Sequence, residues 1–432
     1  MLMLLENEEG LIENYNKIPE VIPPSLPERV YIWDETLRDG EQTPGVFLTM
    51  EEKVEIAKLL DEVGVSVIVP GYPAVSKTEK DTVKKIANEN LSNALVAAPA
   101  RPIKEDIDLC LECDVDEIPI FMPTSRFMIK YSLNKSLQEA LEMIHDAISY
   151  AENHGVKVDF VAEDATRAKL EDLAYIFRMV AEAGVSKIII ADTVGIMRPL
   201  SMRYLISNLR ATLREYQVEF GVHCHNDLGL ATANTLAAVE EGIIYPHTCV
   251  NGYGERAGNA AFEEVVVTLE ALYGVKTGVK MDRIYELSKF VELCFDIPLP
   301  LHKSLVGGNA FAHESGIHVR ALLRHKLTYQ PIPPETIGRK TEFLLGKFTG
   351  SSIIRYMLKS KGIEVTENQL KEIVERVKKL QESRGKVVAK EAFSKIKQLM
   401  KEVRRNVSER ELIEIANEVL REERSIREQN AE

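Results

Sequence analysis

The sequence has little of several features that mark special classes of protein. Only 5 of its 432 residues are cysteine, and only 6% are aromatic. No apolar run approaches the roughly 18 residues of a membrane helix, so a disulfide scaffold and a membrane partner are not expected. The first residues, MLMLLENEEG, have a short apolar stretch and no cationic start, which is not typical of a signal peptide. We therefore expect a cytoplasmic protein.

Positive charge is also scarce. The 54 lysine and arginine residues are outnumbered by 67 acidic ones, which gives a formal charge of −13. A general nucleic-acid binder needs a basic surface, so we expect no nucleic-acid partner. Any polyanionic ligand must be met by locally clustered lysine and arginine side chains.

The five cysteines are scattered, and only Cys110 and Cys113 form a CxxC pair. This pair lies in the stretch DIDLCLECDVD, which has the composition of a helix. No second pair lies nearby to complete a metal site. We therefore expect plain helix packing of these thiols rather than metal or redox chemistry.

Short β-branched or apolar runs alternate with amphipathic stretches of helical length from residue 30 onward. The eight runs are Val30–Trp33, Ser66–Val69, Ala94–Ala98, Glu117–Phe121, Val156–Val161, Lys187–Ala191, Val218–His223 and His247–Val250. This alternation indicates parallel strands, and eight units in about 240 residues match a (β/α)8 TIM barrel. A doubly wound open sheet is the rival, but no glycine-rich dinucleotide or P-loop pattern follows a run to favour it.

The chain after the barrel pattern is expected to be small and mostly helical. The predicted divisions are a lead-in over 1–29, the catalytic barrel over 30–275, a linker or subdomain over 276–350 and a helical C-terminal subdomain over 351–432. Capping boxes at Thr366 with Gln369, and at Ser408 with Glu411, predict the starts of two C-terminal helices.

Polar residues gather where the predicted strands end, and this is where barrels form their active sites. His223 and His225 lie two apart on the seventh run, so both side chains point the same way. Imidazole suits a borderline divalent metal, and the carboxylate of Asp39 would complete a ligand set with open positions. The plain alternative is a pair of hydrogen-bonded histidines. Opposite the acidic first loop, metal binding is the favoured interpretation.

Two further residues suit such a site. Arg38 neighbours Asp39, and a guanidinium beside a metal can stabilise negative charge that develops on a substrate oxygen. The alternative role for Arg38 is a salt bridge to Glu35 or Glu163. A glycine-rich loop after the eighth run would let Asn259 reach the same metal.

Four motifs, DETLRDGEQTPGV, HCHNDLGLATAN, NGYGERAGNAAFEEVV and HESGIHV, occur in this order. They resemble the 2-isopropylmalate, homocitrate and citramalate synthase family over about residues 30–380. The wider superfamily includes hydroxymethylglutaryl-CoA lyase. The resemblance implies an acyltransferase that condenses acetyl-CoA with a 2-oxo acid in a Claisen-type reaction and then hydrolyses the thioester. It also implies a divalent metal ion (Mg, Mn or Zn), with acetyl-CoA and the 2-oxo acid as small-molecule substrates.

The resemblance also assigns roles by position. The implied metal ligands are Asp39, His223, His225 and Asn259. The implied substrate and catalytic contacts in the barrel are Arg38, Gln42, Glu163 and Thr193. Arg38 would stabilise the developing alkoxide, Thr193 would contact the substrate carboxylate, and Glu163 matches the active-site glutamate after the fifth strand.

His318 and Tyr329 match residues that are tied to proton transfer in the family. There they reach in from the neighbouring subunit, so the resemblance implies a domain-swapped homodimer. A base is chemically required because the methyl protons of a thioester are weakly acidic. Taken alone, each is equally well read as a polar residue packed in an irregular loop.

The segment after the fourth run, PTSRFMIKYS, is similar to the homocitrate branch of the family. Arg126 or Lys130 in it would pair with the distal carboxylate of a dicarboxylic acceptor, and Arg101 matches an arginine common in the family. We therefore expect 2-oxoglutarate first and oxaloacetate second. A branched acceptor (2-oxoisovalerate) and pyruvate remain open.

Some features depart from the family pattern or leave other activities open. Val69 stands where a glutamate is usual, and Phe348 and Thr349 replace a histidine and a serine. The length leaves no room for a large regulatory domain, so we expect no leucine control through one. A carbon–carbon lyase on a related barrel and a non-catalytic, metabolite-binding barrel are the competing hypotheses.

Overall fold

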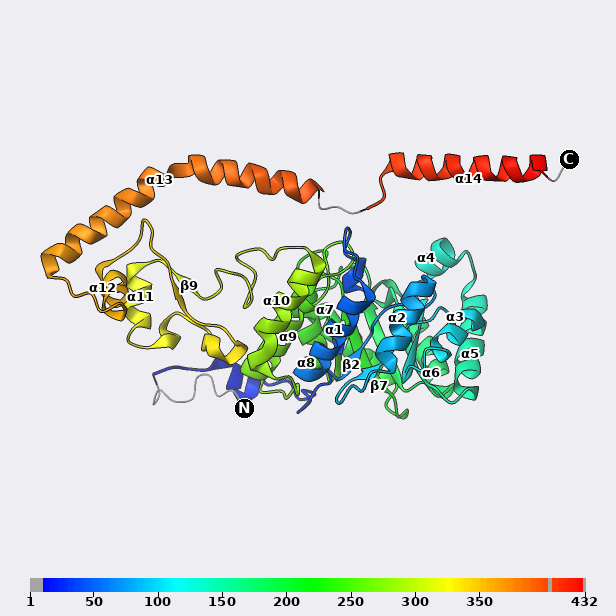
Figure 1. Ribbon diagram of the computed structural model, residues 1–432. Helices are drawn as coiled ribbons and strands as arrows, with labels where there is room; N and C mark the ends of the chain where they lie inside the picture. Colours follow the sequence, from blue (N-terminus) through cyan, green and yellow to red (C-terminus); the bar gives the residue numbers. More distant parts are fainter. Residues whose placement is uncertain (1–10, 403–405, 430–432) are drawn as a thin grey trace.

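The chain forms a closed barrel of parallel strands that is followed by a smaller, mostly helical region (Figure 1). The computed structural model describes residues 11–402 and 406–429. Residues 1–10 of the predicted lead-in, and 403–405 and 430–432 of the predicted C-terminal subdomain, lie outside the described residues. The predicted (β/α)8 TIM barrel with a helical C-terminal region is confirmed.

All hydrogen-bonded neighbours in the barrel run parallel, in the order β3-β2-β1-β8-β7-β6-β5-β4. The strands are β1 (Trp33–Asp34), β2 (Val67–Ile68), β3 (Leu95–Val96), β4 (Glu117–Pro123), β5 (Lys157–Glu163), β6 (Lys187–Asp192), β7 (Glu219–Cys224) and β8 (Tyr245–Thr248). Parallel bridges from Ala97 to Glu117 and from Ala100 to Ile120 join the two ends of this order and close the barrel.

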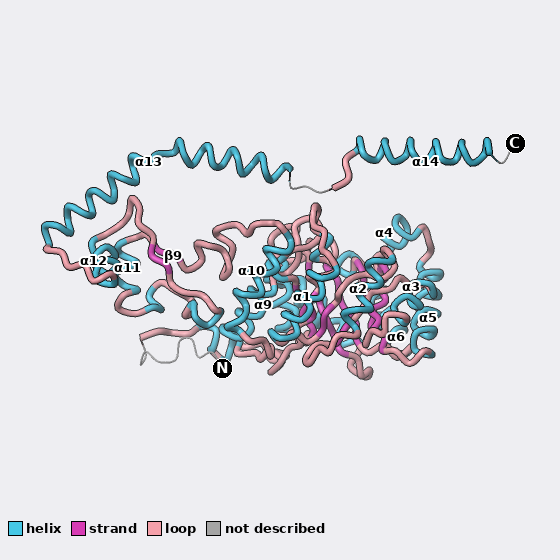
Figure 2. The backbone as a smooth tube through the Cα atoms, in the orientation of Figure 1, coloured by secondary structure: helices cyan, strands magenta, loops and turns pink. Residues whose placement is uncertain are grey.

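Helices surround the strands (Figure 2). They are α1 (Met50–Val63), α2 (Lys77–Ala87), α3 (Lys104–Leu111), α5 (Leu137–Asn153), α6 (Leu170–Glu182), α7 (Pro199–Thr212), α8 (Ala231–Glu240) and α9 (Phe262–Thr268), with the short α4 (Arg126–Met128) in the loop after β4. Capping boxes start α1 at Thr49 and α5 at Ser136. Helix α5 buries Leu141, Ile144 and Ile148 against the core, as its apolar stripe predicts.

All five cysteines are free and buried. The Sγ atom of Cys110 lies 3.6 Å from the carbonyl oxygen of Ala98 and 3.5 Å from that of Pro99. Burial raises the pKa of Cys113 to about 11, which keeps this thiol protonated at neutral pH. The expected packing role of the pair is confirmed.

The packed barrel unit extends beyond residue 275. Helix α10 (Ile284–Phe295) packs against α1, and its buried Leu287 and Val291 join the barrel's hydrophobic core. The same core takes in Ile332 and Ile337 from the segment that we expected to be a linker. This segment therefore contributes to barrel packing over much of its length.

A second, smaller core follows. The strands β9 (Ala312–His313) and β10 (Glu342–Phe343) pair in parallel, and helix α11 (Gly316–Leu322) follows β9. Helix α12 (Ser351–Ser360) packs against α11, and α13 (Glu367–Glu402) packs against α12. The buried residues of this second core are Val319, Ile353, Ile354 and Leu370. The predicted capping box of Thr366 and Gln369 is confirmed at the start of α13.

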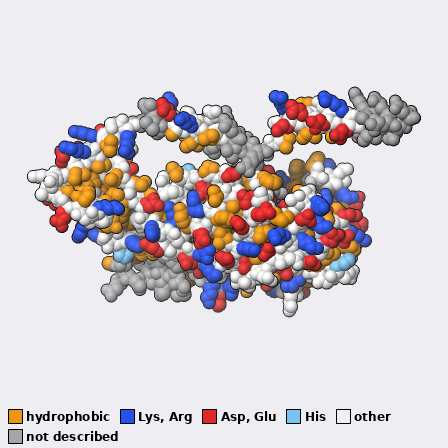
Figure 3. Space-filling view, in the orientation of Figure 1, with side chains coloured by type: hydrophobic (Ala, Val, Ile, Leu, Met, Phe, Trp, Pro, Cys, Tyr) orange, Lys and Arg blue, Asp and Glu red, His pale blue; other side chains and the backbone are white. Residues whose placement is uncertain are grey.

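Helices α13 and α14 (Glu409–Gln429) lie outside the barrel in Figure 1, and the predicted cap of Ser408 and Glu411 precedes α14. Both carry exposed apolar side chains along their length (Figure 3). These are Leu380, Phe393, Ile396, Leu399, Leu412, Ile413, Ile415, Val419 and Leu420. Within the described part of the chain, no helix combines the length and apolarity needed to cross a bilayer.

Candidate metal centre and active-site pocket

Two histidines and an aspartate meet at the carboxyl ends of β7 and β1. His223 is in β7 and His225 follows two residues later, so both rings face the barrel mouth. Nε2 of His223 lies 3.6 Å from Oδ2 of Asp39, and Nε2 of His225 lies 3.8 Å from the same oxygen. The two Nε2 atoms are 3.2 Å apart. One ligand atom from each residue lies within 4.8 Å of the others, so a single ion can be shared by all three.

Asn259 completes the donor set. Its Nδ2 donates a hydrogen bond to Oδ1 of Asp39 at 2.8 Å. The amide oxygen of Asn259 is buried and has no hydrogen-bond partner among the described residues, although burying such an acceptor unpaired costs free energy. Two imidazoles, a carboxylate and an amide oxygen suit a divalent cation of borderline softness. The residues present therefore fit the metal that the sequence predicts.

The electrostatics of the cluster also suit a cation. Burial, and then the nearby His223 ring, lower the pKa of His225 to about 3, so this imidazole is neutral at physiological pH. Although burial acts in the opposite direction, Arg38 and then His223 hold the pKa of Asp39 well below its usual range. The cluster thus offers the neutral imidazole of His225 and the carboxylate anion of Asp39.

A glycine lets the loop after β8 close over this cluster. Gly254 has φ +151°, and a Cβ at this position would lie 2.1 Å from Nδ2 of Asn259 and 2.9 Å from Oδ1 of Asp39. A side chain would therefore push the loop away from Asp39 or displace Asn259. The glycine-rich loop has a site-specific role here, which is to bring Asn259 to the cluster.

The cluster forms one wall of a cavity of about 270 Å³. Four of the residues predicted to contact substrate line it, namely Arg38, Gln42, Glu163 and Thr193. Burial, and then the neighbouring Asp164 carboxylate, raise the pKa of Glu163 above its ordinary value. The Oγ1 atom of Thr193 accepts a hydrogen bond from the backbone N–H of Asp164 at 2.8 Å, which ties the ends of β5 and β6 together.

The wall beyond the metal ligands is largely apolar. The residues on that side are Val69, Tyr72, Pro99, Pro119, Phe121 and Val161. Tyr72 donates a hydrogen bond from its hydroxyl to Asp106. This part of the cavity presents carbon surface to a bound molecule.

The structure does not bring Arg101 or Arg126 into this cavity, because neither is among the described residues that line it. Arg126 donates from Nε and Nη2 to Asp172 at 2.7 and 2.8 Å, and its side chain is 61% exposed. Arg101 makes a similar two-bond pair with Asp106 at 2.8 Å. Each guanidinium that we expected to face the acceptor is held by a carboxylate on a neighbouring helix.

His318 and Tyr329 lie together, with ring centroids 4.1 Å apart. They belong to α11 and to the turn after it, and neither lines the barrel cavity of its own chain. In Figure 1 the α11 region lies to the side of the barrel, beyond α10.

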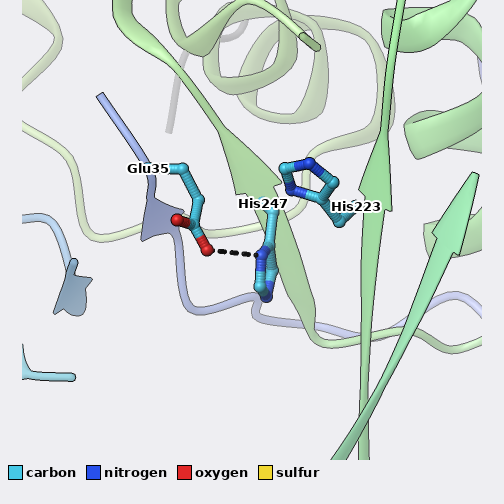
Figure 4. A group of neighbouring side chains, drawn as sticks. All are labelled: Glu35, His223 and His247. Atoms are coloured by element: carbon cyan, nitrogen blue, oxygen red, sulfur yellow. Dashed lines mark ion pairs between the residues drawn. The ribbon is translucent and has the colours of Figure 1, made fainter. Parts of the chain in front are cut away.

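Sequence reasoning missed Glu35 and His247 as parts of the site. Glu35, His223 and His247 form a second buried group whose ligand-type atoms lie within 4.8 Å of one another (Figure 4). From the sequence, Glu35 is expected only as a salt-bridge partner of Arg38, and His247 only as the first residue of a strand. The signal that could reveal Glu35 is its spacing from Trp33. The two residues lie at alternate positions at the end of the first run, so their side chains point the same way.

The position of the cluster, at the carboxyl ends of parallel strands, is that of the active sites of barrel enzymes, and its donor set is that of a metal-dependent one. The chain belongs to the HMGL-like family, whose model matches residues 29–291. A second model, described as homocitrate synthase post-HMGL domain-like, matches residues 305–385.

Individual relatives agree with this family. The 2-isopropylmalate synthase of Methanocaldococcus jannaschii is 49% identical over 360 residues, which are 82% of this chain and 69% of that protein. Homocitrate synthase AksA of the same organism is 47% identical over 368 residues, which are 85% and 90% of the two chains. The crystal structure of Bacillus subtilis HMG-CoA lyase matches 64% of this chain and 96% of its own, with 25% identity and a TM-score of 0.57.

Proposed function

We propose that the protein is an acyltransferase that condenses acetyl-CoA with a 2-oxo acid and then releases free CoA. The observation that carries the proposal is the buried cluster of Asp39, His223 and His225 beside Arg38, at the mouth of an HMGL-like barrel. The relatives named as 2-isopropylmalate and homocitrate synthases support this reaction type.

In the proposed reaction a base takes a methyl proton from the acetyl thioester. The resulting enolate carbon attacks the keto carbon of the 2-oxo acid, and the keto oxygen becomes an alkoxide that takes up a proton. Water then cleaves the thioester, which gives the free carboxylic acid and CoA. Every step is thus a proton transfer, an addition or a hydrolysis, and no oxidant is needed.

The residues of this chain have distinct roles in that sequence. Asp39, His223, His225 and Asn259 would hold a divalent ion, which supplies Lewis-acid polarisation of the keto group when bound. The Arg38 guanidinium, 25% exposed at the cavity wall, would stabilise the alkoxide. Thr193 and Gln42 would orient the acceptor's carboxylate, and Glu163, at the end of β5, would take or give a proton there.

The cavity favours an acceptor with an apolar side chain. Val69, Pro99, Pro119, Phe121 and Val161 in this wall carry no polar side-chain group, and the hydroxyl of Tyr72 beside them already donates to Asp106. A second carboxylate would therefore be buried unpaired there, which is costly. We therefore propose a branched 2-oxo acid such as 2-oxoisovalerate as the preferred acceptor. This replaces the dicarboxylate that the sequence favoured through Arg126.

A dicarboxylic acceptor is the second candidate, because the C-terminal segment matches the homocitrate synthase post-HMGL model. Arg256 is the cationic residue, other than Arg38, among the described residues that line the cavity. It now pairs with Asp227 at 2.7 Å and would have to exchange that partner for the substrate.

We also propose a cytoplasmic homodimer in which each barrel is completed by His318 and Tyr329 of a second copy. These two side chains lie against each other but outside the cavity of their own chain. The exposed apolar side chains of α13 and α14 are the surfaces that a second copy would cover. Removal of the proton from the acetyl methyl group would then be carried out by side chains of the partner chain.

A thiol-release screen tests the function. Acetyl-CoA and a divalent metal ion are supplied with 2-oxoisovalerate, pyruvate, 2-oxoglutarate or oxaloacetate, and free CoA is measured. We expect release that needs both metal and acceptor and is fastest with 2-oxoisovalerate. A fastest rate with 2-oxoglutarate would establish the second candidate, and no release with any acceptor would refute the condensing activity. His223→Ala serves as the inactive control. Arg126→Ala should not lower the rate of CoA release with any one acceptor selectively.

A further inference from the structure

Glu35 lies one residue after β1 and is 4% exposed. Its carboxylate contacts three different side chains. Oε2 accepts a hydrogen bond from Nε of Arg38 at 2.8 Å, and Oε1 accepts one from Nε1 of Trp33 at 3.1 Å. Oε1 also lies 3.2 Å from Nδ1 of His247, the contact drawn as a dashed line in Figure 4.

These contacts join the two chemical parts of the cavity. On one side, Nη1 of Arg38 lies 3.1 Å from Oδ2 of Asp39, so the guanidinium bridges the Glu35 and Asp39 carboxylates. On the other side, the His247 ring stacks on Trp33 and meets the His223 ring edge-on, at centroid distances of 4.7 and 5.5 Å. Glu35 thus links the arginine of the cavity to His247 of β8, whose ring packs against the metal-ligand His223 of β7.

Glu35 is a buried anion. Burial alone would raise its pKa, but Arg38 and then His247 hold the pKa of Glu35 at about 2. A buried carboxylate that is paired in this way holds its partner in one geometry, because releasing the arginine would leave the charge unpaired.

The group of Glu35, His223 and His247 has the spacing of a metal site, but its surroundings argue against a second cation. Both Glu35 oxygens are already hydrogen-bonded, and the Arg38 guanidinium occupies the cationic position beside them. A second metal would have to displace a positive charge that is already there. The arrangement therefore suits orientation of Arg38 better than metal binding.

Among the described residues, Asp39 is the other carboxylate that contacts Arg38, and it does so at Nη1, not at Nε. The adjacent strand end carries Val69, whose backbone N–H donates to the carbonyl oxygen of Asp34 and whose side chain lines the cavity. Asp34 turns away and accepts a hydrogen bond from the backbone N–H of Thr36. Glu35 is thus the acidic group that faces Nε of Arg38.

We propose that Glu35 is the positioning residue of Arg38, holding the guanidinium at the place where negative charge develops on the acceptor oxygen. The inference rests on the proposed condensing function. Glu35 acts through Arg38 and not on the substrate, so its removal should weaken the transition state more than the binding of either substrate.

Steady-state kinetics of Glu35→Gln, Arg38→Ala and the double variant test this. We expect Glu35→Gln to lower kcat about 10- to 100-fold while both KM values stay within about 3-fold, and Arg38→Ala to lower kcat by about 100-fold or more. The double variant should match Arg38→Ala, because Glu35 has nothing to position once the arginine is gone. Glu41→Gln is the matched control. Glu41 lies in the same loop as Glu35, and the substitution breaks its pair with Lys53 but should keep wild-type kcat.

Two results would overturn the proposal. One is a double variant in which the two losses multiply, since Glu35 would then act independently of Arg38. The other is a Glu35→Gln variant with wild-type kcat. If Glu35→Gln does not fold, Glu35→Asp replaces it. Its shorter side chain draws the carboxylate back from Nε of Arg38, so kcat should fall while both KM values stay within about 3-fold, and wild-type kcat would overturn the proposal.

A second measurement does not depend on turnover. Phenylglyoxal labels accessible guanidinium groups, and labelling of the Arg38 peptide can be followed by mass spectrometry. Release of Arg38 from Glu35 should make this labelling several-fold faster in Glu35→Gln than in wild type, while other arginines are unchanged. Equal rates would refute the positioning role. If wild type releases no CoA with any acceptor, the proposed function fails, and the labelling still decides whether Glu35 holds Arg38.

Discussion

Asp39 is far from His223 and His225 in the sequence, yet one ligand atom from each of the three residues lies within 4.8 Å of the others. In the part of the chain that the structure describes, the amide oxygen of Asn259 has no hydrogen-bond partner at the same place. This combination is costly for a protein that binds nothing there, because a buried unpaired acceptor loses its hydration. At the scale of single residues, the arrangement is therefore explained best by a cation.

Removal of one ligand tests this view. We expect His225→Ala to lower the affinity for Co²⁺ by more than about 100-fold, because the remaining donors no longer surround the ion. Titration of the metal-free protein, followed by the visible absorption of bound Co²⁺, measures the change. His145→Ala, at an exposed histidine of α5, should bind Co²⁺ like wild type. Equal affinity in His225→Ala would remove the cluster from metal binding.

The sequence predicted much of this site, because strand alternation places His223 and His225 on one face and the barrel brings the strand ends together. It could not predict the partners of long side chains. Arg126 was expected at the acceptor, yet Asp172, which is 46 positions away in the sequence, holds it on the barrel's outside. A guanidinium takes the carboxylate that the fold brings nearest, and a local motif does not specify which one that is.

At the scale of elements, the sequence located every strand of the barrel, but not the residues at which each strand begins and ends. The run Val30–Trp33 predicted the first strand, whereas β1 covers Trp33–Asp34. The earlier residues pair differently: Val30 donates to the carbonyl of Lys276, and Tyr31 donates to that of Ile244. Apolar runs report burial, and burial begins before regular pairing with the neighbouring strand does.

Helix α10 shows a related limit. Its buried face predicts an amphipathic helix, but a stripe does not say which surface it covers. Packing of Leu287 and Val291 into the barrel core extends the barrel unit past the boundary that we placed at residue 275.

The barrel interior between the strands holds a buried charge network. Nζ of Lys187 in β6 lies 2.6 Å from Oε1 of Glu117 in β4 and 3.4 Å from Oδ1 of Asp159 in β5. All three residues are at most 3% exposed. Without the lysine, two carboxylates would face each other in a space that water does not reach.

We expect Lys187→Met to lower the free energy of unfolding by about 3 kcal/mol or more, because it removes the buried counter-charge of both carboxylates and leaves Glu117 with the exposed Lys157, 3.9 Å from its Oε1. Denaturant unfolding followed by circular dichroism measures the loss. Arg376→Ala is the control, because it breaks an exposed pair with Glu372 on α13 and should change stability by less than about 0.5 kcal/mol. Similar effects of both substitutions would show that burial does not decide the strength of these pairs.

At the scale of the whole molecule, the chain separates its chemistry into two places. The cluster around Asp39 and Arg38 is in the barrel, while His318 and Tyr329 lie together in the α11 region, which is beyond α10 in Figure 1 and packs against α12. Long apolar surfaces on α13 and α14 remain exposed in the single chain. A second copy that covers these surfaces would bring the two places together, which a single chain does not do.

Mixed dimers test this sharing of sites. Asp39→Asn and His318→Ala chains, each inactive alone, are co-expressed with different affinity tags, and dimers carrying both tags are purified. If each site uses the barrel of one chain and His318 of the other, the mixed dimer keeps one intact site of two, and we expect about half of wild-type CoA release. A mixed dimer of Asp39→Asn and His223→Ala should stay inactive, because both barrels are then defective. Activity of the first mixed dimer no higher than that of its parents would mean that each chain builds its site alone, and His318 would have to reach its own barrel by a rearrangement of the segment after α10.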